Sequence, residues 1–398
     1  MKELLSAAVS SHLGNSSMIR RMFEAGIELK KKYGASNVYD FSLGNPDLPA
    51  PPEVKAAMAE LTEQASDPFA FGYMPNAGFP EARAVLAKKV SAEQGTAVPA
   101  DKIVITCGAA GGINVLFRAV LEPGDEVLCP APYFVEYGFY AENYGGVLKS
   151  VPTKPDFSLD IEAFGAAITP KTRAVIINSP NNPTGQIYSA GEIEALAGLL
   201  TRRSAENGRP IYLISDEPYR FLNFDGVEIP SVFRNYDASV VIGSFSKNLS
   251  LPGERIGFVA VNPALENAEE LVGGLIFCNR TLGFVNAPVL GQKLILKCAE
   301  SAVDVNIYRA RRDRMAKVLT DAGIEFTMPR GAFYFFPKSP VADERVFIDA
   351  LVNERVLAVP GRGFGMPGYF RLAFCVSEKT IADSAESFKR AAAAVAGC

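Results

Sequence analysis

The sequence predicts an α/β protein with two domains. A large α/β domain with a mostly parallel sheet is expected over residues 45–290, and a smaller α+β domain is expected from residues 1–44 and 291–398. Three observations support this fold class. A chain of 398 residues is too long for one compact core. Short apolar runs alternate with helical patterns between residues 101 and 261. Polar turns follow these runs, as expected where an open sheet binds ligands beside the carboxyl ends of its strands.

The composition is that of an ordinary globular protein, with 48% hydrophobic and 21% charged residues. The formal net charge of -4 indicates no general affinity for nucleic acid or for an anionic membrane. No apolar run is long enough to span a membrane, and residues 1–11 lack the pattern of a signal peptide. The six cysteines form no C-x-x-C pair and are expected to be reduced thiols, which predicts a cytoplasmic protein. The only histidine is His12, which argues against a multi-histidine metal site and a Ser-His-Asp triad.

The first elements are predicted from helical spacing and from the positions of glycine and proline. Amphipathic spacing predicts a helix over 16–32, and an apolar run predicts a strand over 38–43 that ends in a turn at Gly44. Prolines in the first turn predict a helix over 52–61 and another that begins at Pro80.

A turn of small residues follows the next strand. The strand is expected over 101–106, and Cys107 to Gly112 then lead into a helix that ends near Leu121. Free N–H groups at a helix N-terminus attract anions, and small residues let an anion approach the backbone. Ala109 and Ala110 can contribute only backbone donors here. The G-x-G-x-x-G pattern of dinucleotide-binding folds is absent.

Later apolar runs end in polar residues. Strands are expected over 126–129, 149–153, 172–177 and 211–215, with a helix over 190–205. The third strand leads to Asn182, in a loop fixed by two prolines and a glycine. The fourth leads to Asp216, and an acid at the end of a buried strand is unfavourable unless it is paired or caps a helix. Phe134, beside Tyr133, follows the first strand and would also suit an ordinary core.

The segment from Val240 to Val261 predicts two buried strands joined by a polar loop. The loop contains Lys247, with Ser244 and Ser246 before it and Arg255 after it. A lysine beside a hydrophobic wall is driven toward its neutral form, which can form a Schiff base with an aldehyde. Two hydroxyl groups and a guanidinium suit a phosphate. Pyridoxal phosphate (PLP) carries both an aldehyde and a phosphate. An exposed loop with a solvated lysine is the alternative.

The C-terminal part alternates helix and strand less regularly. Helices are expected over 307–322 and 346–356, strands over 331–337 and 369–375, and a mobile loop over 360–365. Arg371 occupies an inward position of the last strand, where its charge needs a counterpart. The α-carboxylate of an amino acid, held bidentately, would supply one, and a structural salt bridge is the alternative.

The order of these motifs resembles one known family. Ser-x-Ser-Lys followed by Gly-Glu-Arg-Ile-Gly, the phrase Tyr-x-Pro-x-x-Gly-x-Pro-x-x-Arg from Tyr73, and Asn-Pro-x-Gly from Asn182 look like segments of the class I aminotransferases. These are the aspartate aminotransferase-like members of the fold type I PLP-dependent transferases. The resemblance extends from Tyr73 to Arg371.

The resemblance implies a role for each matching residue. Lys247 would bind PLP, Asp216 would keep the pyridine nitrogen protonated, and Tyr219 and Asn182 would bond the ring O3′. Phe134 would stack on the ring. The phosphate would be bound by Gly108, Ala109, Ala110, Ser244, Ser246 and Arg255, and by Tyr73 of a partner subunit in a homodimer. Gly44, Asn182 and Arg371 would bind the substrate carboxylate, and no metal is implied.

The implied activity is transfer of an α-amino group between an L-amino acid, possibly aspartate or glutamate, and a 2-oxo acid through the Lys247 Schiff base. A β-eliminating C–S lyase of the same fold would share almost all of these residues, and a decarboxylase or a cyclase is also open. A PLP-sensing regulator would need a further N-terminal module. Arg280 is a candidate for binding a distal substrate carboxylate.

Overall fold

The computed structural model describes residues 4–14 and 18–396, and the contacts divide the chain into two compact units. The larger unit comprises residues 46–306 and 330–332, and the smaller unit comprises the remainder. The larger unit continues past residue 290, the end that the sequence predicts for it, and includes residues 291–306. Helix α10 (Val289–Cys298) packs on two other helices of that unit, and the amide of Val303 donates to the carbonyl of Asn248 over 2.8 Å.

A seven-stranded sheet organises the larger unit, in the order β2-β8-β7-β6-β5-β3-β4. Strand β8 runs antiparallel to both of its neighbours, and every other neighbouring pair is parallel. All of these strands except the edge strand β4 are almost wholly buried, which explains why they read as continuous apolar runs. Their bounds are β2 Ile103–Cys107, β3 Glu126–Ala131, β4 Val147–Pro152, β5 Thr172–Asn178, β6 Tyr212–Asp216, β7 Ser239–Ser244 and β8 Ile256–Val261.

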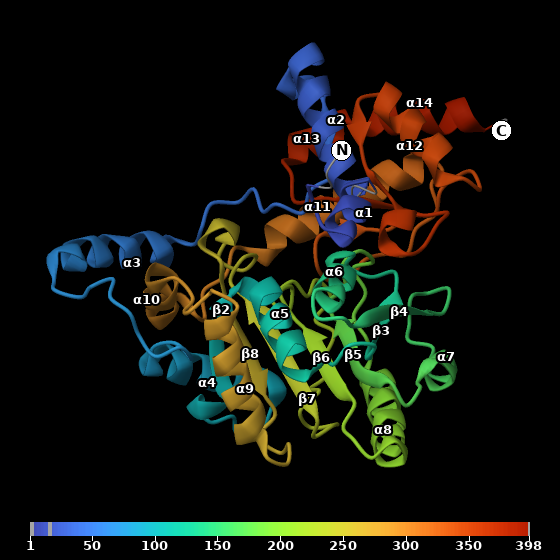
Figure 1. The fold of residues 1–398 in the computed structure, drawn as a ribbon. Helices are drawn as coiled ribbons and strands as arrows, with labels where there is room; N and C mark the ends of the chain where they lie inside the picture. Colours follow the sequence, from blue (N-terminus) through green and yellow to red (C-terminus); the bar gives the residue numbers. More distant parts are fainter. Residues whose placement is uncertain (1–3, 15–17, 397–398) are drawn as a thin grey trace. The chain divides into compact units, whose positions relative to one another are not determined.

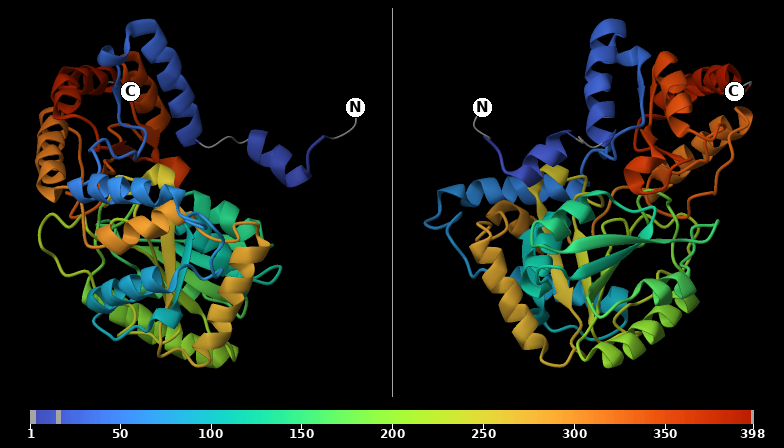
Figure 2. Two further views of the ribbon diagram at one scale, coloured as in Figure 1. Left: turned by 90° about the vertical axis from the view of Figure 1, so that its left-hand side faces the viewer. Right: turned by 45° about the vertical axis from the view of Figure 1, so that its right-hand side comes forward.

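Helices surround this sheet. In Figure 1, α5 crosses the sheet with α9 beside it, and α5 contacts β2, β7 and β8. Helices α3 and α10 lie side by side, as both views in Figure 2 agree. The helices of the larger unit are α3 Pro52–Glu63, α4 Pro80–Gln94, α5 Gly108–Val120, α6 Glu136–Glu142, α7 Ile161–Ala167, α8 Ala190–Asn207, α9 Ala268–Thr281 and α10.

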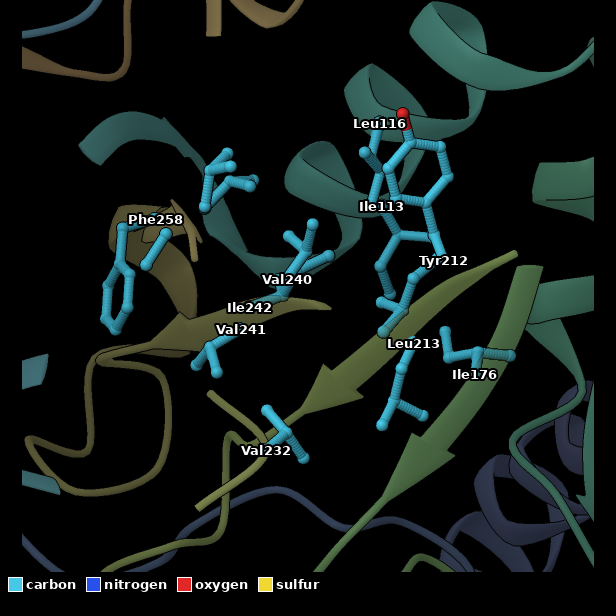
Figure 3. Packing of buried hydrophobic residues seen from close by; sticks show 14 of the residues in the cluster. Ile113, Leu116, Ile176, Tyr212, Leu213, Val232, Val240, Val241, Ile242 and Phe258 are labelled. Atoms are coloured by element: carbon cyan, nitrogen blue, oxygen red, sulfur yellow. The ribbon is translucent and has the colours of Figure 1, made fainter. Parts of the chain in front are cut away.

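Successive side chains of β7 point to opposite faces of the sheet. Val240 points toward α5, where Ile113 and Leu116 lie, whereas Val241 points to the opposite face, toward Val232 (Figure 3). All five side chains are at least nine-tenths buried. This alternation follows from the period of two along a strand, and both faces of β7 are covered.

The smaller unit contains two small sheets. One pairs β1 with β10 in parallel, and the other has the antiparallel order β11-β12-β9. Its strands are β1 Tyr39–Asp40, β9 Tyr334–Phe335, β10 Val356–Leu357, β11 Val359–Pro360 and β12 Phe370–Ala373. Its helices are α1 Ala7–Gly14, α2 Met18–Tyr33, α11 Val305–Asp321, α12 Glu344–Asn353, α13 Glu378–Asp383 and α14 Ala385–Val395.

Three predictions for the smaller unit need correction. The strands predicted over 38–43 and 331–337 are only two residues long each, because continuous strand pairing is limited to those residues and Gly331 forms only an isolated bridge with Asn223. The loop predicted over 360–365 forms strand β11 at its start and then a 3₁₀ turn, η5 (Gly361–Phe364). The predicted helix start at Ser16 lies outside the described residues, and the rest of that helix is present as α2.

Among the described residues, no helix combines the length and the apolar character that a membrane crossing requires.

Candidate active site

The sheet brings the ends of several strands to one edge. Strands β5, β6 and β7 are parallel, and the register places Asn178 beside Asp216 and Asp216 beside Ile242. Strand β2 ends at Cys107 opposite Ile256, where β8 begins. The residues that follow these strands therefore lie along one edge of the larger unit, as the order of motifs predicts.

Asp216 is the most unusual side chain at this edge. It is buried, and the hydroxyl of Tyr137 donates a hydrogen bond of 2.5 Å to its Oδ2. Among the residues that the structure describes, none forms a hydrogen bond with its Oδ1. Burial raises the pKa of Asp216 to about 7; the hydrogen bond from Tyr137 opposes this rise and the charge of Glu217 adds to it. A buried oxygen without a partner costs free energy, so this carboxyl group is prepared for a donor from a ligand.

The neighbouring Glu217 is compensated within the protein. Its carboxylate accepts hydrogen bonds from the hydroxyl of Ser215 at 2.7 Å and from Arg220 at 2.9 Å. Arg220 is held by the carbonyl oxygens of Glu93 and Ile229. The two adjacent acids thus have different environments, since the protein pairs Glu217 and leaves one oxygen of Asp216 for a ligand.

An asparagine links Asp216 to the loop that carries Asn182. The side chain of Asn178 donates to the carbonyl of Asp216 over 2.7 Å and accepts from the amide of Asn182 over 2.6 Å. Asn182 and Tyr219 are both buried. Nζ of Lys247 lies 6.0 Å from the centre of the Tyr219 ring. The structure therefore brings together the predicted residues Asn182, Asp216, Tyr219 and Lys247.

The predicted anion site combines a helix N-terminus with Arg255. Gly108 has a positive φ of 71°, and a Cβ atom there would lie 2.9 Å from Nη2 of Arg255. The next two residues, Ala109 and Ala110, are half-buried in the first turn of α5. Gly257, two residues after Arg255, also leaves no room for a side chain, since its Cβ would lie 2.8 Å from the amide nitrogen of Ala109. Glycine at 108 and 257 lets β8, α5 and the guanidinium approach one another closely.

Other predicted residues of the larger unit occupy several positions at this edge. Ser244 ends β7 and is half-buried, and Ser246 is buried in the loop that follows. Phe134 is half-buried and packs edge-on against Tyr137, with ring centres 5.6 Å apart.

Tyr73 and Arg280 are not enclosed by the larger unit. Tyr73 is 94% exposed, and Phe69 nearby is 92% exposed. Arg280 is exposed near the end of α9, with its guanidinium 5.6 Å from the ring of Phe277. The structure of one chain therefore does not gather these two residues with the others.

The smaller unit contains two of the three predicted carboxylate-binding residues, Arg371 and Gly44, whereas Asn182 belongs to the larger unit. Arg371 is 3% exposed and donates from Nη2 to the carbonyl of Ser42 over 2.5 Å. Its guanidinium carbon lies 4.8 Å from the ring centre of Tyr334 and 4.7 Å from that of Phe364. A Cβ atom at Gly44 would lie 1.9 Å from the Tyr334 hydroxyl oxygen, so only glycine fits there.

Three residues next to the predicted site were not singled out from the sequence, namely Tyr137, Tyr334 and Phe364. Tyr137 lies only three residues after Phe134, so helical spacing could have drawn attention to it. The sequence offers no comparable signal for Tyr334 and Phe364, whose contacts with Arg371 depend on strand pairing and on a turn.

The chain is similar in sequence to known aminotransferases. The family model for aminotransferase class I and II matches residues 36–388. The aspartate/prephenate aminotransferase of Thermus thermophilus is 32% identical over 358 residues, which cover 87% of this chain and 89% of that protein. A probable aspartate/prephenate aminotransferase of Aquifex aeolicus is 31% identical over 369 residues, covering 89% and 91%.

Solved structures agree in fold. The crystal structure of an aminotransferase from Eubacterium rectale superposes with a TM-score of 0.93 at 39% identity and covers 98% of each chain. The Thermus thermophilus aspartate aminotransferase with maleate gives a TM-score of 0.86 at 29% identity, covering 98% of this chain and all of the other. The matched residues 36–388 extend over both units, so the chain belongs to the class I and II aminotransferases, whose members depend on PLP.

Proposed function

We propose that the larger unit binds PLP through Lys247, and that the enzyme uses it to move an amino group between an L-amino acid and a 2-oxo acid. The observation that carries this proposal is Asp216, a buried carboxyl group with Oδ1 lacking a partner among the described residues. A protonated ring nitrogen is the donor that such an oxygen suits.

The residues around Asp216 fit the rest of the cofactor. The amides of Ala109 and Ala110 and the guanidinium of Arg255 supply donors for a phosphate, with the hydroxyls of Ser244 and Ser246 on the adjacent loop. Tyr219 and Asn182 are buried hydrogen-bonding groups for the ring oxygen, and the face of Phe134 suits stacking on the ring. These roles are our proposals.

When bound, PLP supplies an aldehyde for a bond to an amine and a ring that draws electrons from the substrate. Nζ of Lys247 would hold the cofactor and, as a free amine, would take the proton from the substrate α-carbon. Asp216 would stabilise a proton on the ring nitrogen, and the hydroxyl of Tyr137 holds Asp216 in place through Oδ2. Arg371 binds the α-carboxylate with in-plane donors, and the Gly44 backbone lies in the same unit.

We propose dicarboxylic amino acids as the first substrates to test. The relatives from Thermus thermophilus and Aquifex aeolicus are named aspartate/prephenate aminotransferases. A relative from Thermococcus litoralis, 29% identical, is named an aromatic-amino-acid aminotransferase, so aromatic amino acids are the second class to test. Arg280 is exposed in this chain, and the proposal for dicarboxylates rests on the relatives rather than on Arg280.

We further propose a cytoplasmic homodimer in which the partner subunit's Tyr73 completes the phosphate site. The support is the exposure of Tyr73 at 94%, together with that of Phe69 and Phe71 at 92% and 56%. Large apolar side chains gathered at a surface favour a protein interface. The five cysteines that the structure describes are free thiols, which suits a reducing compartment.

The decisive experiment is a half-reaction. Protein loaded with PLP is mixed with one amino acid at a time, without a 2-oxo acid, and the absorbance of the cofactor, ammonia and pyruvate are followed. Conversion to the pyridoxamine form without ammonia is expected, and Lys247→Ala is expected to abolish it. Continuous ammonia release would contradict the proposal and favour the β-eliminating lyase, a name that none of the relatives reported above carries.

A further inference from the structure

Two aromatic rings of the smaller unit lie close to the guanidinium of Arg371. Its guanidinium carbon lies 4.8 Å from the ring centre of Tyr334 and 4.7 Å from that of Phe364. The N–H donors of a guanidinium point outward in its plane, so rings beside its faces direct hydrogen bonding to the edges. The donation from Nη2 to Ser42 uses one edge. The two rings therefore help to set the plane in which Arg371 can bind a carboxylate.

The two rings are held in different ways. Tyr334 belongs to β9, which pairs with β12, the strand of Arg371. Phe364 belongs to the 3₁₀ turn η5 and is followed by Gly365, with φ of 75°, and Gly368, with φ of 85°. The position of Phe364 therefore depends on the contacts that hold the loop 361–368 in place.

The carboxylate of Glu344 binds this loop near both ends, and the adjacent Asp343 accepts one further hydrogen bond, of 3.0 Å, from Nη2 of Arg362. Oε1 of Glu344 accepts from Nε of Arg362 at 2.6 Å and from the Arg362 amide at 3.3 Å. Oε2 accepts from Nη2 of Arg362 and from the amide of Gly368, both at 3.0 Å. Glu344 thus bridges a residue before Phe364 and a residue after it.

Glu344 is in a position where an unpaired charge would be costly. It is fully buried at the start of α12, whereas the side chain of Arg362 is 30% exposed. Burial alone would raise the pKa of Glu344, but the hydrogen bonds from Arg362 and Gly368 outweigh it and bring the pKa below its usual value. A buried carboxylate that makes four hydrogen bonds to one loop is strong enough to hold that loop in a single position.

We infer that Glu344 is a positioning residue for substrate binding, because it holds loop 361–368 so that the Phe364 ring stays against the guanidinium of Arg371. The inference rests on the proposed role of Arg371 in binding the α-carboxylate. The affinity for the substrate carboxylate then depends on the ion pair between Glu344 and Arg362. In the described contacts, neither of these two residues touches Arg371.

The first test is steady-state kinetics of Glu344→Gln, which keeps the shape of the side chain and removes its charge. The KM values for the amino acid and for the 2-oxo acid are expected to rise about 5- to 20-fold while kcat changes less than about 2-fold, because uniform binding is lost. The same factor is expected for every amino acid, since the α-carboxylate is common to all of them. The dissociation constant of PLP is expected to stay unchanged.

The second test asks whether Glu344→Gln raises KM because it displaces the ring of Phe364. Phe364→Leu keeps an apolar side chain and removes the ring, and it is expected to raise KM by a similar factor. If Glu344 acts through this ring, the KM of the double variant equals the higher of the two single-variant KM values. It does not reach the product of the two increases. Fully multiplicative effects would overturn the inference.

Control variants separate this inference from other causes. Glu354→Gln removes an exposed ion pair with Arg390 just after the other end of α12, and it is expected to leave KM unchanged. If Glu344→Gln does not fold, Arg362→Lys removes the forked hydrogen bonds while keeping the charge, and it is expected to show the same rise in KM. A wild-type KM in a folded Glu344→Gln or Arg362→Lys variant would overturn the inference. A wild-type KM in Arg371→Lys would instead contradict the proposed role of Arg371.

Discussion

The hydroxyl of Tyr137 and the carboxyl group of Asp216 form a hydrogen bond of 2.5 Å between two buried side chains that are 79 residues apart in the sequence. The bond occupies Oδ2 of Asp216, and Oδ1 has no hydrogen bond among the described residues. Tyr137 therefore decides which oxygen of Asp216 is left for a ligand. It also opposes the effect of burial on the pKa of Asp216.

Tyr137→Phe is expected to weaken PLP binding about tenfold, because a hydrogen bond to a charged group contributes on the order of 1.5 kcal/mol or more. Without the bond, the pKa of Asp216 rises further and its carboxylate becomes a poorer partner for a protonated ring nitrogen. Titration of the cofactor-free protein with PLP measures the dissociation constant. Tyr188→Phe, at another buried tyrosine of the same unit, is the control. Equal constants for Tyr137→Phe and wild type would contradict this role.

The cofactor-free protein is expected to lose stability as the pH rises from about 4 to about 7, relative to Asp216→Asn. The pKa of Asp216 is raised from 3.8 to about 7, chiefly by burial. In this pH window the folded protein keeps a proton that the unfolded chain has released. The free energy of unfolding therefore falls with pH, by up to about 1.4 kcal/mol per pH unit for one group, and levels off above the folded-state pKa.

Urea unfolding of both cofactor-free proteins between about pH 5 and 8 measures this difference in the free energy of unfolding. A difference that does not change with pH would show that the pKa of Asp216 is not raised in the folded protein.

Gly44→Ala is expected to destabilise the protein by about 1–3 kcal/mol, because the added Cβ would lie 1.9 Å from the Tyr334 hydroxyl oxygen. Tyr334→Phe in the same chain is expected to restore only part of the loss, since the ring carbon Cζ is still 2.8 Å away. Thermal or urea unfolding checks both variants. Gly273→Ala in α9, where a Cβ meets nothing within 4 Å, is the control and is expected to be neutral or stabilising. Equal effects of the two alanines would rule out the steric explanation.

Gly108→Ala is expected to weaken PLP binding while leaving Lys247 able to react. The residue has a φ of 71°, which alanine adopts with strain, and its Cβ would lie 2.9 Å from Nη2 of Arg255. The guanidinium must move away from the first turn of α5, so we expect the dissociation constant for PLP to rise about tenfold or more. Inorganic phosphate should compete with PLP less effectively than in the wild type. An unchanged phosphate affinity would show that Arg255 and α5 do not form the anion site.

The sequence by itself determined the fold class, the family and most of the buried strands of the large sheet. Strand β7 illustrates the reason, because Val240, Val241 and Ile242 are apolar on both faces and only a covered sheet strand buries both faces. Asp216 and Lys247 could be selected because each is a charged residue next to such a run, a local pattern that needs no knowledge of distant contacts. Strands β1 and β9 shrank because their pairing depends on partners far along the chain.

Only the tertiary structure decided which side chains meet. Tyr137 reaches Asp216, Tyr334 fills the space that a side chain at Gly44 would need, and Glu344 holds the loop of Phe364. None of these contacts leaves a periodic signal, because each joins residues from separate elements. The sequence dictates which residues are apolar or charged at each position, whereas packing two elements together decides which of them come within hydrogen-bond distance.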